Sequence, residues 1–142
     1  MKKMMTALLF VGVSTLSIAQ EGIPSGRELQ AKVEQKTKMI NTADLKKMID
    51  ESPDLVLVDI RTKSEIQKMG GAIEVPQNIN IPRGWLEFSI QSKTQGKETP
   101  IVVYCGGGLR SPFAAETLQQ MGYTNVWNYS EGYMAWKRTM MK

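Results

Sequence analysis

The chain of 142 residues contains no histidine. Histidine supplies the base of Ser-His-Asp triads and of Cys-His pairs, and it is a common ligand of zinc. Its absence excludes hydrolases of these two types and every histidine-ligated metal site within this chain. We expect no resident metal and no cofactor.

Cysteine is scarce as well, because Cys105 is the single copy. One cysteine cannot form a disulfide within the chain, which excludes a disulfide-stapled scaffold. The sequence also lacks a strong excess of one charge, since 18 lysines and arginines accompany 14 acidic residues for a formal net charge of +4. These charges are interspersed, so we expect no nucleic-acid partner.

A hydrophobic run near the start has the composition of a targeting segment. Lys2 and Lys3 precede an apolar stretch that ends with small residues at Ser17 and Ala19. This order is typical of a secretory signal peptide. An uncleaved membrane anchor is the alternative, although the stretch is short for a span. We expect a signal peptide over 1–19, cleavage after Ala19, a periplasmic or secreted protein, and no stable membrane association after cleavage.

The remaining sequence divides into a leader and one domain. Residues 20–37 are polar and weakly helical, and we expect a loose leader that can pack as an extra helix. Residues 38–142 have the length of a single domain, and the sequence contains no repeats or low-complexity tracts.

Within this domain, apolar runs alternate with stretches of helical periodicity. The runs at 55–58 and 101–104 are continuously apolar, as in strands buried on both faces. Further strands are expected at 79–81 and 126–128, and helices at 43–50, 63–69, 86–90, 112–121 and 133–139. This alternation predicts an α/β fold, with a central parallel sheet flanked by helices on both faces.

Cys105 directly follows the apolar run 101–104 and opens a glycine-rich segment that leads into an expected helix. Ser111 is a suitable N-cap for that helix, and Pro112 suits its first position. Glycines let backbone amides approach a ligand, and a helix N-terminus attracts negative charge. We expect a lowered thiol pKa inside an anion cradle, rather than a buried structural cysteine. The cradle residues are Gly106, Gly107, Gly108, Leu109, Arg110 and Ser111.

Asp59 and Arg61 follow the other long apolar run and are candidate supporting residues. Side chains two apart face the same way on a strand, so both could point toward the crevice at Cys105, with Asp59 fixing the loop through its amides. A surface ion pair is the alternative. Of the tryptophans, Trp136 is expected in the core. Trp85 is expected in a loop, where it could line a pocket, but packing in the core or covering apolar surface is favoured.

Four segments in this order resemble the single-domain rhodaneses, a family of sulfurtransferases, and with the expected signal peptide the chain resembles an exported bacterial type. The resemblance covers about residues 38–137. Its carriers are Leu55 to Arg61, Asn78 to Pro82, Cys105 to Ser111, and Met121 to Val126 leading to Gly132 and Trp136. The resemblance implies a rhodanese-like fold for the domain.

The resemblance also implies a persulfide relay. The Cys105 thiolate would take the outer sulfur of thiosulfate or a similar small anionic donor and pass it to cyanide or a thiol acceptor. Gly106 to Ser111 would stabilise the anionic persulfide, and Arg110 would attract the donor. Two positions depart from the family. Gly71-Ala72-Ile73 replaces a frequent Gly-His-Ile, and Gly106 stands where many thiosulfate-using members have a basic residue.

Two other functions are open at this point. A sulfur carrier or protein-binding module would take persulfide from a partner protein and show little turnover on small donors. An anion-ester hydrolase would resemble the phosphatases of this fold, which have five residues between cysteine and arginine. Four residues separate Cys105 from Arg110, and this shorter loop favours a single sulfur atom over a phosphate group.

Overall fold

The computed structural model describes residues 22–142, so the expected signal peptide over 1–19 lies outside the described residues. In chain order the elements are α1 (Gly26–Glu34), β1 (Lys38–Ile40), α2 (Thr42–Glu51), β2 (Val56–Asp59), α3 (Lys63–Lys68), β3 (Asn78–Asn80), η1 (Arg83–Trp85), α4 (Leu86–Ser89), η2 (Ile90–Lys93), β4 (Ile101–Tyr104), α5 (Ser111–Gln120), β5 (Val126–Tyr129) and α6 (Gly132–Met140). Within 22–142, no helix combines the length and apolar character needed to cross a bilayer.

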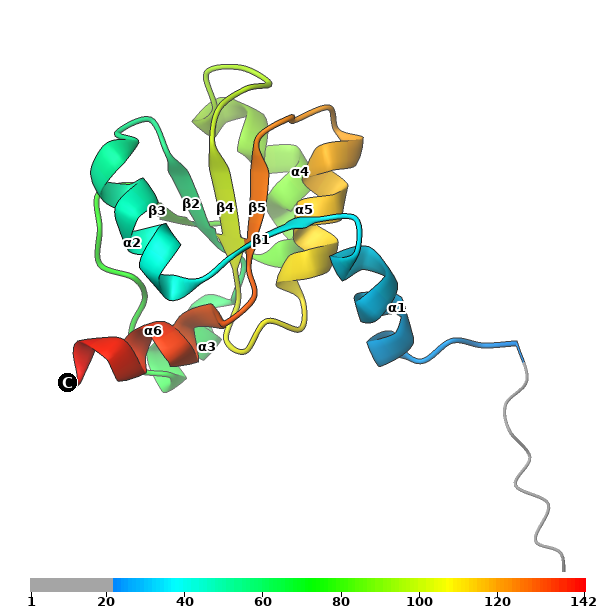
Figure 1. Cartoon of the computed structure of the whole chain (residues 1–142), viewed down its shortest axis with the longest axis horizontal. Coiled ribbons are helices and arrows are strands. Elements are labelled where there is room, and N and C mark those ends of the chain that lie inside the picture. The colour runs from blue at the N-terminus through cyan, green and yellow to red at the C-terminus, as the bar shows by residue number, and fades with distance from the viewer. Residues whose placement is uncertain (1–21) are drawn as a thin grey trace, which may run out of the picture.

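A five-stranded sheet lies at the centre of the domain, in the order β1-β5-β4-β2-β3. Every strand pair is parallel. Strands β2 and β4 are buried at every position, as their continuous apolar runs predict. The parallel arrangement places the carboxyl ends of the central strands β2, β4 and β5 at one edge of the sheet, at the bottom of Figure 1, where the loop after β4 turns toward α5.

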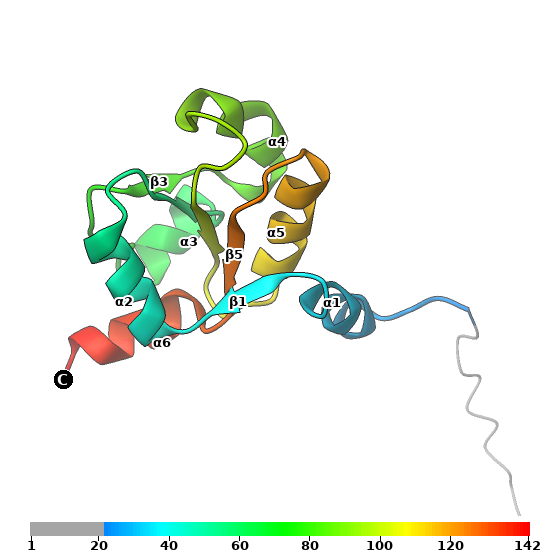
Figure 2. The same cartoon turned by 45° about the horizontal axis from the view of Figure 1, so that its top comes forward.

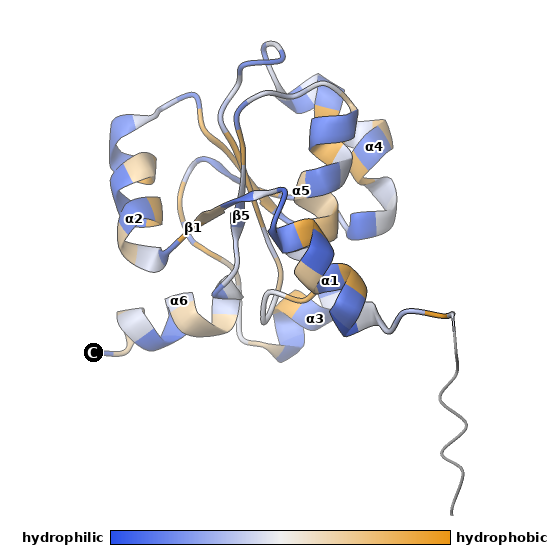
Figure 3. Ribbon diagram, turned by 45° about the vertical axis from the view of Figure 1, so that its right-hand side comes forward, coloured by the Kyte–Doolittle hydropathy of each residue, from blue (hydrophilic) through white to orange (hydrophobic). Residues whose placement is uncertain are grey.

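Helices cover both faces of this sheet, which confirms the predicted α/β architecture. Figures 1 and 2 show α4 and α5 on one face and α2 and α6 on the other. The first face packs Leu86, Ala114 and Leu118 against the strands, and the second packs Leu45 and Trp136. Figure 3 shows hydrophobic residues concentrated along the inner strands and hydrophilic residues on the outer surfaces of the helices.

Three local features differ from the sequence-based expectation or refine it. Strand β1 has no predicted counterpart, because two of its three residues are exposed and leave no apolar run. Strand β3 begins one residue earlier than expected. Part of the leader forms α1, which starts with a capping box between Ser25 and Glu28 and buries Val33.

The two tryptophans have different environments. Trp136 is buried in the core, as predicted. Trp85 is not in the core, so that part of the expectation was wrong, because this residue is 65% exposed. The following residue, Leu86, takes the interior position at this point of the chain and is fully buried. The Trp85 ring instead contacts the exposed Phe88 edge to face, with 6.3 Å between centroids.

Candidate active site

Cys105 lies at the carboxyl end of β4, and only 1% of its surface is exposed. Its Sγ atom is 3.9 Å from the Ser111 hydroxyl oxygen at the start of α5. Of the loop residues between them, Gly106 and Gly108 are buried, whereas Gly107 and Leu109 are exposed. The loop therefore surrounds the sulfur with backbone and keeps its one large apolar side chain outside.

The environment of Cys105 favours the thiolate. Burial by itself raises the pKa of a thiol, because it removes the charged form from water. Here the backbone amides of Arg110, Ser111 and Gly108, together with the Ser111 hydroxyl, donate toward the sulfur, and the pKa of Cys105 falls below its ordinary value. Most of these donors are main-chain groups, so the loop conformation itself creates the anion site.

The first turn of α6 holds this loop in place from the opposite side. The backbone N–H of Tyr133 donates to the Cys105 carbonyl at 2.9 Å, and the N–H of Met134 donates to the Gly106 carbonyl at 3.0 Å. These bonds satisfy free amides at the helix N-terminus. They also fix the orientation of two carbonyl groups at the start of the loop.

Two glycines allow the loop and α6 to approach each other. Gly108 has φ +81°, and a Cβ atom there would overlap the Ser130 carbonyl oxygen. Gly132 has φ +68°, and its Cβ would lie 2.6 Å from the Gly106 carbonyl oxygen. Both positions therefore require glycine for conformation and for space.

Helix α5 begins one residue earlier than the sequence predicted. Ser111 is its first residue rather than its N-cap, and Arg110 occupies the N-cap position without a side-chain cap. The Ser111 hydroxyl faces Cys105 instead of the helix amides. The cap preference of serine is overridden here because the hydroxyl contacts the sulfur.

Asp59 and Arg61 form a buried ion pair, which corrects both sequence-based alternatives. Asp59 does not bond the loop amides but accepts bonds from Arg61 Nη2 at 2.6 Å, from Nε at 2.9 Å and from the Arg61 backbone N–H. The pair is not on the surface, since both side chains are fully buried. Arg61 also donates to the Gly71 carbonyl and stacks on the Tyr133 ring at 4.2 Å. The pair thus joins the end of β2 to the segment after α3 and to α6.

Arg110 does extend from the loop, but it is paired. Its Nη2 atom is 2.6 Å from Glu65 Oε1, and its Nη1 is 3.1 Å from Glu65 Oε2. The side chains are 43% and 36% exposed respectively. Hydrogen bonds from Arg110 are the largest cause of a pKa of about 2 for Glu65, followed by a bond from the Thr62 backbone N–H.

Sequence reasoning missed Glu65 and the first turn of α6 as parts of this site. Thr62 and Glu65 have the spacing of a capping box, so their local role at the start of α3 was readable. The contact between Glu65 and Arg110 spans 45 positions of sequence and depends on the strand order. No local sequence pattern predicts a contact between residues so far apart in the sequence.

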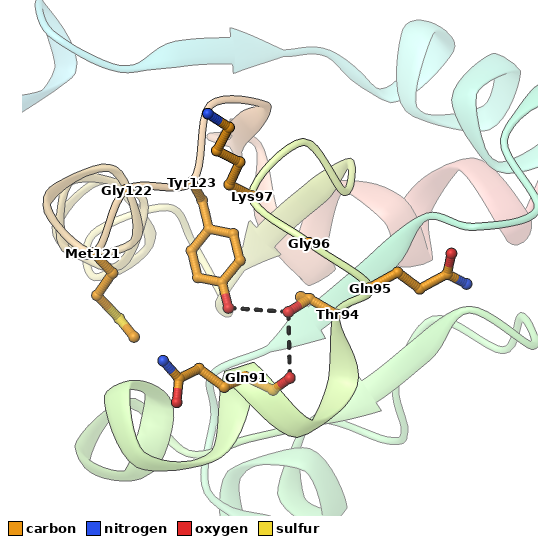
Figure 4. A pocket seen from close by; sticks show the side chains of 8 residues that line it. All are labelled: Gln91, Thr94, Gln95, Gly96, Lys97, Met121, Gly122 and Tyr123. Atoms are coloured by element: carbon orange, nitrogen blue, oxygen red, sulfur yellow. Dashed lines mark hydrogen bonds between the residues drawn. The ribbon is translucent and has the colours of Figure 1, made fainter.

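A hollow of about 330 Å³ lies at the other end of the sheet, between the η2–β4 loop and the end of α5. Figure 4 shows its lining, in which the hydroxyl groups of Thr94 and Tyr123 are 3.0 Å apart. Cys105, Glu65 and Arg110 do not border this hollow. It contains none of the chemistry of the cysteine loop and is not the candidate site.

The arrangement around Cys105 supports nucleophilic chemistry on a small anion. A thiol with a lowered pKa supplies the nucleophile, and converging amides stabilise negative charge on an atom bound to it. No imidazole base is needed, because the ionised sulfur attacks directly. Arg110 is the charged residue nearest to Cys105 in the sequence, and Glu65 binds it in bidentate fashion.

Comparison with known proteins places the chain in a family. The family model described as "Rhodanese-like domain" matches residues 41–139. A mitochondrial protein of Schizosaccharomyces pombe, provisionally named a thiosulfate sulfurtransferase, is 36% identical over 92 residues, which cover 57% of this chain and 62% of that protein. A sulfurtransferase of Allochromatium vinosum is 34% identical over 101 residues, covering 70% of this chain and 87% of the relative.

A solved structure shares the fold. A protein of unknown function from Rhodopseudomonas palustris, whose name suggests a tyrosine phosphatase, is 30% identical, with a TM-score of 0.69. The alignment covers 84% of this chain and 97% of that one. With the parallel five-stranded sheet, the cysteine loop at its carboxyl edge and a family match over most of the domain, the chain belongs to the rhodanese-like sulfurtransferase family.

Proposed function

We propose that this protein transfers a sulfane sulfur from thiosulfate or a similar anionic donor to cyanide or a thiol, through a persulfide on Cys105. The observation that carries the proposal is the buried thiol with a lowered pKa inside a ring of backbone amides. A persulfide is an anion one atom longer than a thiolate, and these amides are suited to hold its outer sulfur.

The reaction is balanced without a redox partner. The Cys105 thiolate attacks the outer sulfur of thiosulfate, the S–S bond of the donor breaks, and sulfite leaves with the bonding electron pair. The acceptor, cyanide or a thiolate, then attacks the outer sulfur of the persulfide. The bond between the two sulfur atoms breaks, thiocyanate or a new persulfide leaves, and the Cys105 thiolate is regenerated.

Intact-protein mass spectrometry tests this proposal. Incubation with thiosulfate should add one sulfur atom, and later addition of cyanide should remove it and release thiocyanate. The Cys105→Ser variant should fold normally and gain no mass. A wild-type protein that takes sulfur from no donor, or thiocyanate formation by the variant, would place the chemistry elsewhere.

A sulfur-carrier or protein-binding role is the second candidate, because one observation favours it. Trp85 and Phe88 are 65% and 81% exposed and contact each other edge to face rather than packing into the core. Exposed aromatic pairs are common at partner surfaces. If this role dominates, a protein-bound persulfide should load Cys105 much faster than thiosulfate does. Replacing Trp85 and Phe88 with alanine should then slow loading from the protein donor alone.

Ester hydrolysis is disfavoured by the loop. Four residues separate Cys105 from Arg110, one fewer than in the phosphatases of this fold, and Arg110 is held by Glu65. A chromogenic phosphate ester distinguishes the two reactions. Release of the chromophore that depends on Cys105 would overturn the argument from loop length.

We also propose that the protein is exported and that residues 1–19 are removed. The basic start, the apolar stretch and the small residues before Gln20 support this. Expression of the full chain in a bacterium, followed by fractionation and N-terminal analysis, should give a periplasmic or secreted protein that begins at Gln20. A full-length protein retained in the cytosol would contradict export.

A further inference from the structure

Glu65 makes contacts that its role in helix capping does not require. Its Oε2 atom accepts bonds from the Thr62 backbone N–H at 2.9 Å and from the Thr62 hydroxyl at 3.1 Å, which completes the capping box of α3. Both carboxylate oxygens also bind Arg110, at 2.6 and 3.1 Å. The only arginine of the cysteine loop is therefore bound in bidentate fashion by a carboxylate from α3.

This pairing changes the charge that an incoming donor meets. A free Arg110 would present a positive charge on the loop, but the ionised Glu65 offsets it. The carboxylate is 36% exposed, so it also repels anions that approach from solvent. Attraction of the donor is then left mainly to the backbone amides, so the site favours a second negative charge on the donor less than a free Arg110 would.

We propose that Glu65 is a specificity-determining residue that limits the preference of the site for doubly charged donors over singly charged ones. This inference rests on the proposed sulfur transfer. Thiosulfate carries two negative charges, whereas methanethiosulfonate presents the same type of transferable sulfur with one. Removal of the Glu65 charge should therefore favour thiosulfate more than methanethiosulfonate.

The Glu65→Gln variant isolates the charge from the helix cap. Glutamine also completes a capping box at this position, so α3 retains its start. The matched control is Glu28→Gln, because Glu28 closes the same type of capping box with Ser25 in α1 and binds no arginine. Both variants lose one carboxylate at the third helical position, but only one of them alters the loop.

The first measurement does not require sulfur transfer. Cys105 is the single cysteine, so its alkylation by iodoacetate, an anion, and by iodoacetamide, which is neutral, reports the local charge. The ratio of the two rates should rise about three- to tenfold in Glu65→Gln at low ionic strength, and the gain should shrink in 0.5 M salt. It should be unchanged in Glu28→Gln. A change in thiol pKa alone would alter both rates together and leave their ratio constant.

The second measurement uses the donors themselves. The ratio of kcat/KM for thiosulfate to that for methanethiosulfonate should rise at least as much in Glu65→Gln as the alkylation ratio, because the dianion gains more from the lost repulsion. An unchanged alkylation ratio in Glu65→Gln would overturn the assignment of Glu65, whatever the activity. A raised alkylation ratio with no transfer from either donor in the wild type would instead reject the proposed function.

Discussion

Ser111 contributes to the Cys105 environment through two groups, its backbone amide and its hydroxyl. The Ser111→Ala substitution removes only the hydroxyl, and alanine is compatible with the first turn of α5. Loss of a donor raises the pKa of Cys105, so a smaller fraction of the thiol is ionised at neutral pH. We expect the rate of iodoacetamide alkylation at pH 7 to fall roughly threefold, because hydrogen bonds to a charged acceptor contribute measurably but sulfur is a weak acceptor.

The pH dependence of alkylation separates this effect from a loss of access. In Ser111→Ala the midpoint of the rate profile should move to higher pH, while the plateau above it stays similar. Ser92→Ala is the matched control, because Ser92 is exposed and its hydroxyl bonds only the Ser89 carbonyl. An unchanged midpoint in Ser111→Ala would show that the amides act alone.

The Asp59–Arg61 pair predicts a stability effect rather than a chemical one. Both side chains are fully buried, so Asp59→Asn leaves the guanidinium charge without its carboxylate. Breaking a buried pair from one side typically costs about 3–5 kcal/mol. The free energy of unfolding in urea should fall by an amount of that order. Asp54→Asn, which changes an exposed residue just before β2, should have little effect.

A double substitution checks the cause of this loss. In Asp59→Leu with Arg61→Met, no buried charge remains unpaired, so the double variant should be more stable than Asp59→Leu alone. A double variant that is the less stable of the two would mean that the bonds of Arg61 to the Gly71 carbonyl and the Tyr133 ring are the larger contribution.

At the scale of elements, the cysteine loop and the first turn of α6 act as one unit. Gly132→Ala tests this, because it introduces a Cβ 2.6 Å from the Gly106 carbonyl oxygen at φ +68°. Gly122→Ala is the matched control, since Gly122 has φ +100° with open space around it. Both variants should lose about 1–2 kcal/mol of unfolding free energy through backbone strain, and Gly132→Ala should lose more than Gly122→Ala because its Cβ also overlaps backbone atoms. Only Gly132→Ala should also alter the rate of Cys105 alkylation. Equal alkylation rates in the two variants would show that α6 does not influence the cysteine loop.

The elements were predictable where burial leaves a pattern in the sequence. The runs that form β2 and β4 are apolar at nearly every position because both faces of these strands are covered. These runs allowed both strands to be located from the sequence. Strand β1 carries no such signal, since it lies at the edge of the sheet and exposes two of three residues. The exposure of Trp85 was also not predictable from the sequence, because the pattern fits equally well with Leu86 exposed and Trp85 buried.

For the whole molecule, the alternation of strands and helices was sufficient to predict a parallel sheet covered by helices, without β1, but it did not reveal how distant segments meet. The cysteine loop is a local feature, and its place between β4 and α5 was predictable from the sequence, although the helix starts one residue earlier than expected. Glu65 and the amides of Tyr133 and Met134 reach that loop only through the strand order, in which β4 lies between β2 and β5. The position of the cysteine loop was therefore visible in the sequence, whereas the ion pair and the backbone bonds that hold the loop were not.

The ion pair between Glu65 and Arg110 has a consequence for the stability of the whole chain in acid. The pKa of Glu65 is about 2 in the folded protein, first because of Arg110, and it is higher in the unfolded chain. The folded state therefore binds fewer protons, so this contribution is present at neutral pH and is lost as the pH falls from about 5 toward 2. Glu65→Gln lacks the contribution at every pH.

The unfolding free energies of wild type and Glu65→Gln should therefore differ most at pH 7 and converge in acid. Because the carboxylate is 36% exposed, solvent screening limits the difference at pH 7 to about 0.5–1 kcal/mol. Urea unfolding at pH 7, 5 and 3.5 measures it. Glu98→Gln, which changes an exposed residue outside the ion pairs of residues 22–142, should track the wild type at each pH. A gap that stays constant from pH 7 to 3.5 would show that Glu65 stabilises the fold without its charge, and that Arg110 is held by geometry alone.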